Sequence, residues 1–464
     1  MRWINRRQVL AGLAGASAFS LAGFHHAVAD DGFIELTARP TKVKLKGPSS
    51  PDSDLLGYDG LVPGPTLRFT LGQVARVRFH NELDMPSTVH WHGVRLDNAM
   101  DGVPGLTQHP VPPHGSFDYA FTPPDAGTFW YHAHVDSWNQ VARGLFGALI
   151  IDEAKPAFAP ENDHVLVLTD WRVDDTGVFD AESMGNPVEW AGDGRIGNLL
   201  TVNGAVVPEI SVPSGTPQRL RLINTSTARI LRLEIAADKA AIVARDGQTL
   251  ASPRQFTGNI LLGPAQRVDV MAEFSAGIPG ELNEYGGIPV ARFTASAPGK
   301  DQAGPALVAA DLPVPDLDSV RWIPLLMEGG AEAKLVDPEI AEMHGDMGMA
   351  MGTTAAAPAL WAFNSVVGMG DKPLFEAAAG ESVGLDMTNR TQHYHAIHVH
   401  GHHFRIIPET SSATRNETWY DTVVIAPNEH MRVAFVAGKP GKWMIHCHVL
   451  EHSVSGMDTW FRVG

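Results

Sequence analysis

The sequence of 464 residues contains only one cysteine, Cys447. A single thiol cannot form a disulfide within the chain, so no disulfide framework can explain its stability. The thiol is therefore either buried and inert or chemically employed. It lies in the stretch "HCHVLEHSVSGM", residues 446–457, where two histidines flank it directly. These neighbours favour a chemical role.

Positive charge is also scarce. The chain has 35 Lys and Arg residues against 52 Asp and Glu residues, a formal net charge of −17. Such a surface repels nucleic acid and anionic lipid and concentrates cations around the protein. We therefore expect no nucleic-acid partner.

A long apolar run occurs only near the N-terminus, and it is too short to span a bilayer. Arg6 and Arg7 precede the uncharged run Val9–Phe24, which is followed by the small residues "AVA". This order predicts a twin-arginine signal peptide over residues 1–29 and a periplasmic protein. The mature chain would lose three arginines, carry a net charge of −20 and have no membrane segment.

Long stretches with helical periodicity are also rare. Glycine (46 residues) and proline (33 residues) instead separate short alternating runs such as "ARVRFHN", "QRLRLIN" and "MRVAFVAG". Short alternating segments between turn signals are typical of antiparallel β-sandwiches, so we expect an all-β fold.

One such segment recurs three times with equal spacing between a glycine and an asparagine. The copies are Gly72–Asn81, Gly215–Asn224 and Gly380–Asn389. Equal spacing in three copies predicts three related domains. We place the three domains at residues 30–155, 156–300 and 359–464. A linker rich in Ala, Pro and Gly is expected between the second and third domains, at residues 301–358.

Histidines occur in pairs with one residue between them. Side chains at positions i and i+2 of a strand point the same way, so each pair can present two imidazoles to one metal region. Chance placement of 21 histidines would give only about one such pair. The repeat aligns the pairs of the first domain with those of the third, whereas the middle domain has Leu233 and Ile235 there and is expected to be a structural spacer. A metal cluster is therefore expected between the first and third domains, held by His90, His92, His132, His134, His398, His400, His446 and His448.

The cysteine indicates a second metal site. Two histidines, one cysteine and a distant, weakly bound methionine form the ligand set of a blue copper centre. Cys447, His452 and Met457 supply three of these ligands, and His395 is the remaining candidate. The first domain has Ala133 at the position of the cysteine, so the site can exist only in the third domain. Soft sulfur donors exclude magnesium and calcium, and a closed structural zinc site is the alternative.

The segments "LVPGPTLRFTLGQVARVRFHN", "TVHWHGV", "FWYHAHV", "HAIHVHGHHF" and "HCHVLEHSVSGM" resemble the copper-binding signatures of multicopper oxidases. The resemblance is to the three-domain bacterial laccase-like and periplasmic copper-efflux branch, and it covers nearly the whole mature chain. It implies three cupredoxin-like Greek-key β-sandwich domains, four copper ions and a monomer. The implied ligands are His395, Cys447, His452 and Met457 for type 1 copper, His90 and His398 for type 2, and His92, His132, His134, His400, His446 and His448 for the type 3 pair.

The resemblance also implies the reaction. Four one-electron oxidations of phenols, aromatic amines or Cu(I) would be coupled to the reduction of O2 to water. Electrons would enter near His395 or His452, through ring edges that reach the surface, and pass from Cys447 to its neighbours His446 and His448. Mainly cuprous oxidation and copper storage without turnover remain as alternatives. Copper nitrite reductase has two domains and lacks histidines on both sides of the cysteine, which argues against that function.

Two positions, of which one is acidic in this sequence, bear on proton delivery. Asp101 in "MDGVPG" matches the acid that these enzymes place near type 2 copper, where a carboxylate can relay protons. Ser453, in contrast, stands where many bacterial relatives carry a proton-delivering glutamate. The resemblance therefore supports one proton route and leaves the other open.

A methionine-rich segment, "EMHGDMGMAMG", lies within the expected linker. Its thioethers form a soft site that could hold Cu(I) as a substrate. The alternative is a helical segment whose methionines pack, because three of them share helical spacing. The residues concerned are Met343, His344, Met347, Met349 and Met351.

The substitution Cys447→Ser tests the assignment of the thiol. It removes the thiolate that gives a blue copper site its colour and the direct link to the neighbouring histidines. We expect loss of the blue absorption and of oxidase activity, measured by visible spectroscopy and oxygen uptake. A variant that stays blue and fully active would contradict the assignment.

Overall fold

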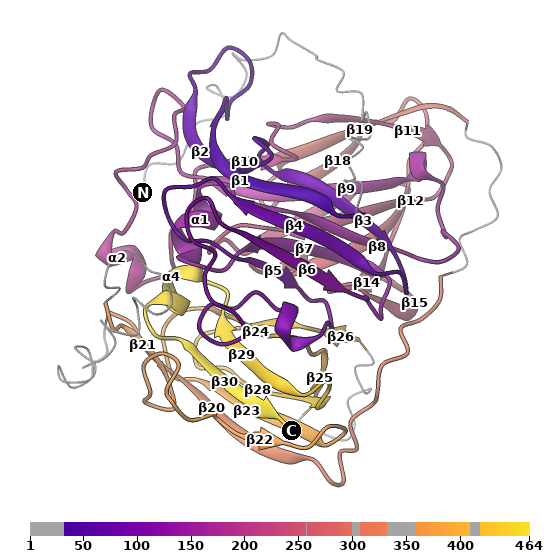
Figure 1. Cartoon of the computed structure of the whole chain (residues 1–464). Helices are drawn as coiled ribbons and strands as arrows, with labels where there is room; N and C mark the ends of the chain where they lie inside the picture. The colour runs from indigo at the N-terminus through magenta and orange to yellow at the C-terminus, as the bar shows by residue number, and fades with distance from the viewer. Residues whose placement is uncertain (1–31, 257, 299–306, 332–357, 409–417) are drawn as a thin grey trace.

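The computed structural model describes residues 32–256, 258–298, 307–331, 358–408 and 418–464. The expected signal peptide and the methionine-rich segment lie outside these residues. Among the described residues, strands predominate, and no helix there is long and apolar enough to cross a membrane. Figure 1 shows the strands gathered into stacked sheets.

The first unit contains two four-stranded sheets, with the strand orders β2-β1-β4-β6 and β3-β8-β7-β5. Its helical segments are η1 (Asn98–Met100) and α1 (Ser137–Ala142). Its strands are β1 (Ile34–Val43), β2 (Ser53–Tyr58), β3 (Gly64–Thr70), β4 (Ala75–Asn81), β5 (Val89–His92), β6 (Ser116–Phe121), β7 (Gly127–Ala133) and β8 (Phe146–Asp152).

The second unit pairs a six-stranded sheet, β10-β9-β12-β17-β14-β15, with a five-stranded sheet, β11-β19-β18-β13-β16. Its helical segments are η2 (Pro160–Asn162) and α2 (Pro187–Trp190). Its strands are β9 (Asp163–Trp171), β10 (Leu199–Val202), β11 (Glu209–Ser214), β12 (Gln218–Asn224), β13 (Leu231–Ala236), β14 (Lys239–Arg245), β15 (Gln248–Gln255), β16 (Ile260–Leu262), β17 (Arg267–Glu273), β18 (Gly280–Glu284) and β19 (Ile288–Pro298).

The third unit has the sheets β21-β20-β23-β28-β25-β26 and β22-β30-β29-β24-β27. Strand β20 lies in the segment expected to be a linker, yet it pairs in parallel with β23. A short helix, α4 (Leu450–Val454), follows β29. The strands are β20 (Arg321–Gly329), β21 (Trp361–Phe363), β22 (Glu376–Ala377), β23 (Ser382–Asn389), β24 (His395–Val399), β25 (Phe404–Ile407), β26 (Trp419–Tyr420), β27 (Thr422–Ile425), β28 (His430–Val436), β29 (Gly441–Cys447) and β30 (Asp458–Val463).

Each pair of sheets encloses apolar side chains. In the second unit, for example, Leu222 and Val270 from one sheet share a buried cluster with Leu233 and Phe293 from the other. Alternation along each strand sends these residues inward and polar residues outward. The predicted all-β class with three cupredoxin-like sandwiches is confirmed.

The asparagine of the sequence repeat has the same role in all three units. Asn81, Asn224 and Asn389 end β4, β12 and β23 and are buried. In each case the side-chain amide donates to at least two backbone carbonyls, and its oxygen accepts the N–H two residues further on. The repeat therefore marks a corner at which one side chain satisfies buried backbone groups.

The first and third units lie against each other although they are far apart in sequence. Their buried apolar residues form one continuous cluster, and α1 of the first unit contacts α4 of the third. Figure 1 shows this meeting, with the indigo strand β5 above the yellow strand β24. The predicted contact between these two units is therefore present.

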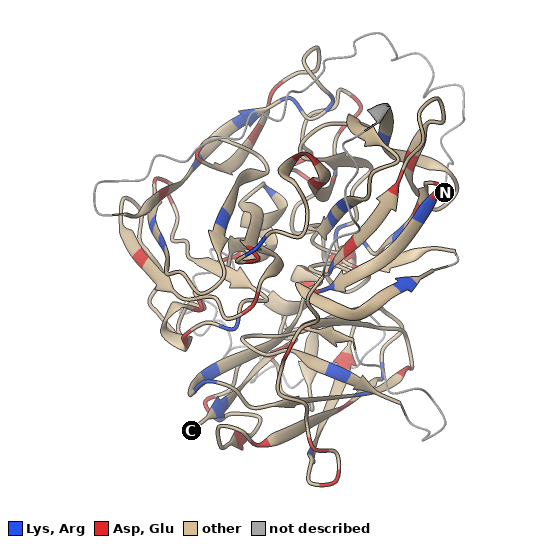
Figure 2. Cartoon of the chain, turned by 90° about the vertical axis from the view of Figure 1, so that its right-hand side faces the viewer, with Lys and Arg blue, Asp and Glu red and all other residues tan. Residues whose placement is uncertain are grey.

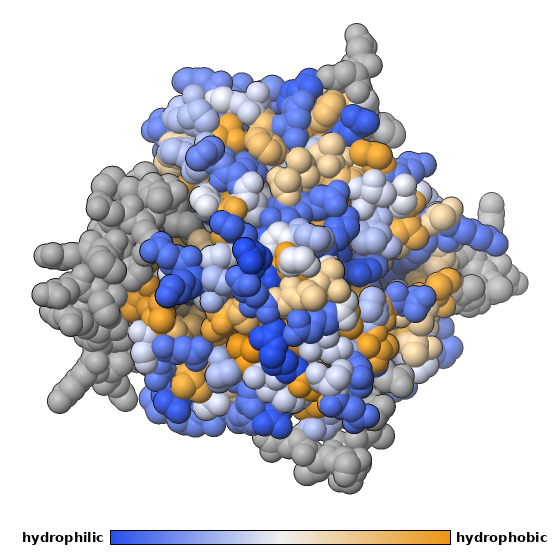
Figure 3. Space-filling model, turned by 60° about the horizontal axis from the view of Figure 1, so that its bottom comes forward, coloured by the Kyte–Doolittle hydropathy of each residue, from blue (hydrophilic) through white to orange (hydrophobic). Residues whose placement is uncertain are grey.

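The surface has a mixed character. Figure 2 shows acidic and basic side chains interspersed along the strands and loops. On the face seen in Figure 3, hydrophobic residues are scattered among hydrophilic ones rather than gathered in one broad patch. Scattered surface apolar residues are normal in folded proteins and mark no particular interface.

The repeated asparagine can be tested in the second unit, away from the histidines. Asn224→Leu keeps a similar volume but leaves the carbonyls of Arg229 and Leu262 without their donor. We expect the free energy of unfolding of the copper-free protein to fall by about 1–3 kcal/mol. The measurement is denaturant unfolding, with the half-buried Asn283→Ala as the control that changes stability little. Equal stability of the two variants would contradict the proposed role.

Candidate metal centre

Two antiparallel strand pairs carry the paired histidines. In the first unit, β5 lies beside β7 with His90 opposite His132. In the third unit, β24 lies beside β29 with His398 opposite His446. The repeat alignment predicts this equivalence of register. At the next position of the same register, Ala133 lies opposite Val89 in the first unit, and Cys447 lies opposite Ile397 in the third unit.

The eight paired histidines converge in the interface between the two units. Six of them form two groups of three with ring centres within 5.8 Å of one another, and His90 is as close to His132 and His134. His92, His132 and His448 lie 5.0–5.8 Å apart, and each belongs to a different H-x-H pair. His134, His400 and His446 lie 5.2–5.5 Å apart.

The two remaining histidines, His90 and His398, lie between these groups. Their ring centres are 5.9 Å apart. His90 also lies 4.0 Å from His400, and His398 lies 3.8 Å from His92. Eight imidazoles thus enclose a compact region with two groups of three and one group of two, in which both units contribute to every group.

Eight ring nitrogens of these histidines have no hydrogen-bond partner, although burial normally requires one. His400 Nε2 and His446 Nε2 lie only 3.1 Å apart. Buried nitrogens that face one another without donors between them fit metal ligation. The unpartnered atoms are His90 Nε2, His92 Nδ1, His132 Nε2, His398 Nε2 and both ring nitrogens of His134 and His448.

Electrostatics favour the form of histidine that binds metals. Burial lowers the pKa of His132, His134 and His448 well below the usual value, and neighbouring imidazoles lower each pKa further. Burial and neighbouring imidazoles lower the pKa of His400 and His446 in the same way. These rings are therefore neutral at physiological pH, with a lone pair available for a metal.

Asp101 lies between two of the groups and is fully buried. Its Oδ2 accepts a hydrogen bond from His400 Nδ1 at 2.9 Å, and its backbone carbonyl accepts from His90 Nδ1 at 2.7 Å. Its Oδ1 has no hydrogen-bond partner. Asp101 is thus adjacent to the cluster, as the sequence predicts.

Asp421 is the counterpart of Asp101 in the third unit, and the sequence analysis missed it. Its carbonyl accepts from His398 Nδ1 at 2.9 Å, and its Oδ1 lies 3.3 Å from His92 Nε2. Each acid therefore contacts one histidine of its own unit and one of the other. The approximate twofold relation of the histidine pairs indicates that a second acid belongs in the third unit, but it does not identify the residue.

The predicted cysteine site is formed by three buried side chains. Cys447 Sγ lies 3.7 Å from both His395 Nδ1 and His452 Nδ1, and the two nitrogens are 3.0 Å apart. Met457 is buried beside them, and its carbonyl accepts from the Cys447 N–H. The three ligand atoms thus face a common point, as a metal site requires.

The free thiol would be protonated in this environment. Burial raises the pKa of Cys447 to about 12, and burial lowers the pKa of His452 to about 3. A bound metal ion reverses this balance for the cysteine because coordination stabilises the thiolate. The site therefore suits a metal better than it suits a reactive free thiol.

The expectation that ring edges of the cysteine site reach the surface is not met. His395 and His452 are fully buried. His395 Nε2 bonds Thr391 Oγ1 at 2.8 Å, and His452 Nε2 donates to the Gly192 carbonyl at 2.7 Å. Gly192 is half-buried and belongs to the second unit, so this unit covers the His452 ring. The expected spacer thus takes part in the site.

Ser453 is also buried, with its Oγ 3.4 Å from His446 Nδ1. It therefore lies beside the cluster, at the position where the family resemblance leads us to expect glutamate. The five residues of the expected Cu(I) segment, from Met343 to Met351, lie outside the described residues.

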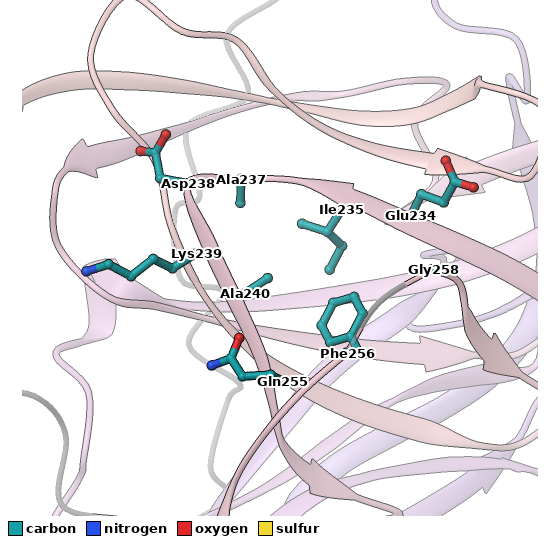
Figure 4. Close-up of a pocket in the computed structure, with 9 residues that line it drawn as sticks. All are labelled: Glu234, Ile235, Ala237, Asp238, Lys239, Ala240, Gln255, Phe256 and Gly258. Atoms are coloured by element: carbon teal, nitrogen blue, oxygen red, sulfur yellow. The ribbon is translucent and has the colours of Figure 1, made fainter.

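A surface hollow of about 570 Å³ lies on the second unit. Figure 4 shows Ile235 and Phe256 facing each other across it, while Asp238 and Lys239 point away. None of its lining residues belongs to the histidine or cysteine sites.

Comparison with known proteins agrees with this geometry. Three domain profiles described as multicopper oxidase match residues 38–156, 162–281 and 341–464. A multi-copper oxidase structure from Pseudomonas thermotolerans is 32% identical, with 93% of this chain and 98% of that chain covered and a TM-score of 0.79.

Two curated relatives extend the comparison. Multicopper oxidase MmcO of Mycobacterium tuberculosis is 29% identical, covering 91% of this chain and 85% of that protein. Laccase-1 of Botryotinia fuckeliana is 26% identical, covering 92% of this chain and 81% of that protein. The matched profiles together span most of the chain. The chain belongs to the multicopper oxidase family, whose members are copper-dependent oxidoreductases with O2 as electron acceptor.

Proposed function

We propose that this enzyme couples four one-electron oxidations of phenols, aromatic amines and Cu(I) to the reduction of O2 to water. The observation that carries the proposal is the position of Cys447 on β29. Its thiol faces His395 and His452, while its neighbours His446 and His448 face the histidine cluster. One strand therefore joins a site suited to single-electron intake with a site that can hold several metal ions.

The proposal places four copper ions. Copper bound at these sites supplies one-electron redox chemistry and polarises O2. The unpartnered ring nitrogens and the sulfur donor support the ligand sets. As the family resemblance implies, these are His395, Cys447, His452 and Met457 for type 1 copper, His90 and His398 for type 2, and the groups His92, His132, His448 and His134, His400, His446 for the type 3 pair.

The reducing substrate would dock over Gly192. The Gly192 carbonyl accepts from His452, and the next residue, Asp193, is exposed and bonds His393 Nδ1 at 2.8 Å. An electron donor resting on this surface would be separated from the His452 ring by a single peptide group. The carboxylate of Asp193 would favour cationic donors there.

Electrons then have a short covalent route. Residues 446, 447 and 448 are consecutive, so the peptide groups of Cys447 connect its thiol with the two neighbouring imidazoles. Successive side chains point to opposite faces, which is why the thiol and the imidazoles reach different sites. His446 Nδ1 also lies 3.0 Å from the Cys447 carbonyl, which reinforces one branch with a hydrogen bond.

Asp101 is the proposed proton carrier. Its Oδ1 is buried without a hydrogen bond, 3.3 Å from His90 Nδ1, while its Oδ2 accepts from His400. A carboxyl group in this position can hold a proton beside the oxygen-reducing cluster and release it during turnover. Ser453 Oγ, close to His446, can only take part through a hydroxyl hydrogen bond.

The substrate range rests on independent observations. The likeness to a laccase supports phenols, and the net charge of −17 and the methionine-rich segment support Cu(I). The twin-arginine segment supports a periplasmic location. The resemblance to periplasmic copper-efflux oxidases supports a monomer that protects the cell against copper. Copper storage is the competing function, and it predicts copper binding without oxygen uptake.

The role of Asp101 is testable with Asp101→Asn. The amide keeps an acceptor oxygen for His400 but cannot carry a proton, so we expect kcat to fall about 10²- to 10⁴-fold. Anaerobic reduction of the blue site by substrate should remain unchanged. Oxygen uptake and stopped-flow absorbance measure the two steps, with the exposed Asp118→Asn as the control. Oxygen uptake at the normal rate in Asp101→Asn would contradict the proton role.

Deletion of residues 343–351 separates the two substrate classes. We expect slower Cu(I) oxidation and loss of any stimulation by added copper, because the soft thioether donors are gone. Oxidation of a phenol without added copper should continue. Oxygen uptake with each substrate and metal counting measure these effects. Unchanged Cu(I) oxidation would remove the segment from the proposal, and copper binding without any turnover of the intact enzyme would favour storage.

A further inference from the structure

The two acids beside the histidine cluster have different surroundings. Asp101 has one oxygen without a hydrogen bond and, among the described residues, no arginine beside it, whereas both oxygens of Asp421 are bound by Arg267. Arg267 Nη1 donates to Asp421 Oδ1 at 2.9 Å, and Nη2 donates to Oδ2 at 2.6 Å. This two-pronged contact fixes the plane and rotation of the carboxylate.

Arg267 is the first residue of β17 and belongs to the second unit. Its guanidinium contacts all three units. In addition to Asp421 of the third unit, it donates from Nε to the Thr128 carbonyl of the first unit at 3.2 Å and from Nη1 to the Ala265 carbonyl at 3.1 Å. The side chain is fully buried. It is therefore held from several directions and cannot rotate without breaking these bonds.

Asp421 transmits this restraint to two histidines. Its Oδ1 lies 3.3 Å from His92 Nε2, which leaves the unpartnered His92 Nδ1 for the cluster. Its Oδ1 also accepts from Thr422 Oγ1, and that hydroxyl lies 3.1 Å from His398 Nδ1. One carboxylate therefore sets the orientation and tautomer of a ring in the first unit and supports a ring in the third.

The backbone beside the pair is adapted to it. Gly93 follows His92 and has a φ of +83°. A Cβ at this position would lie 2.4 Å from Arg267 Nη2 and 2.5 Å from Asp421 Oδ2. Only a residue without a side chain allows the strand that carries His92 to approach the ion pair this closely.

We propose that Arg267 is a positioning residue for the oxygen-reducing cluster, and that it acts through Asp421 on His92 and His398. The second unit thus supplies the part that locks the cluster, although it carries none of the proposed ligands. Lysine cannot reproduce this function because a single ammonium group does not match the two-pronged geometry. The inference rests on the proposed copper sites.

The test compares Arg267→Gln and Arg267→Lys with the double variant Arg267→Gln/Asp421→Asn, which removes both charges of the two-pronged ion pair and leaves Asp246, 3.5 Å from Arg267 Nη1, in place. Arg221→Gln is the matched control. Arg221 is equally buried in the same sheet and bonds Asp163 and Thr128 rather than Asp421. Each full-length protein is equilibrated with copper in chelator buffers. Copper per chain, the type 2 electron paramagnetic resonance signal and the blue absorption are then measured.

We expect the copper affinity of the histidine cluster to fall about 10- to 100-fold in all three Arg267 variants. The type 2 signal should change, while the blue absorption per chain stays at the normal level. The control should lose thermal stability without altering the ratio of cluster copper to blue copper.

Two results would overturn the inference. One is normal cluster affinity with an unchanged type 2 signal in the double variant. The other is parallel loss of cluster and blue copper in the Arg267 variants and in Arg221→Gln, which indicates a purely structural role. Failure of the proposed function is distinct, because the unaltered protein would then bind copper without oxygen uptake.

Discussion

Strand β29 places two sites one peptide apart. Because side chains alternate along a strand, His446 points to the face opposite Cys447, and His448, the first residue after the strand, also faces the histidine cluster. The thiol can therefore join His395 and His452, while its neighbours join histidines of the first unit. The rest of the architecture serves this constraint. The first unit has to lie against the third, and the equivalent strand β7 supplies histidines on both sides of an alanine.

The second unit has more than a spacing function. It covers His452 with the Gly192 carbonyl and reaches the histidine cluster through Arg267. One contact is at the cysteine site, where electrons are proposed to enter, and the other is at the histidine cluster, where O2 is proposed to be reduced. The second unit can therefore influence both sites although it supplies none of the proposed metal ligands. The two acids of the cluster differ for the same reason. Asp421 is held by Arg267, and Asp101 keeps an oxygen available.

The fold class and the histidine sets could be predicted because period-two alternation and the threefold repeat are local signals. Asp421 could not be predicted by alignment, since it lies 21 residues after His400 whereas Asp101 lies nine after His92. Arg267 was missed because an arginine in the alternating run "RVDVMAEF" resembles a solvent-facing residue. Strand β20 was missed within a Pro-rich segment, and the cover over His452 depends on contacts between units that sequence spacing does not encode.

The most direct measurement of the central claim is the stoichiometry of aerobic turnover. If intake at the cysteine site supplies the histidine cluster within one chain, four one-electron oxidations should consume one O2 and release no hydrogen peroxide. A phenol oxidised to its radical and an oxygen electrode with a peroxide assay give both quantities. Two oxidations per O2 with stoichiometric peroxide, or oxidation without oxygen uptake, would contradict the account.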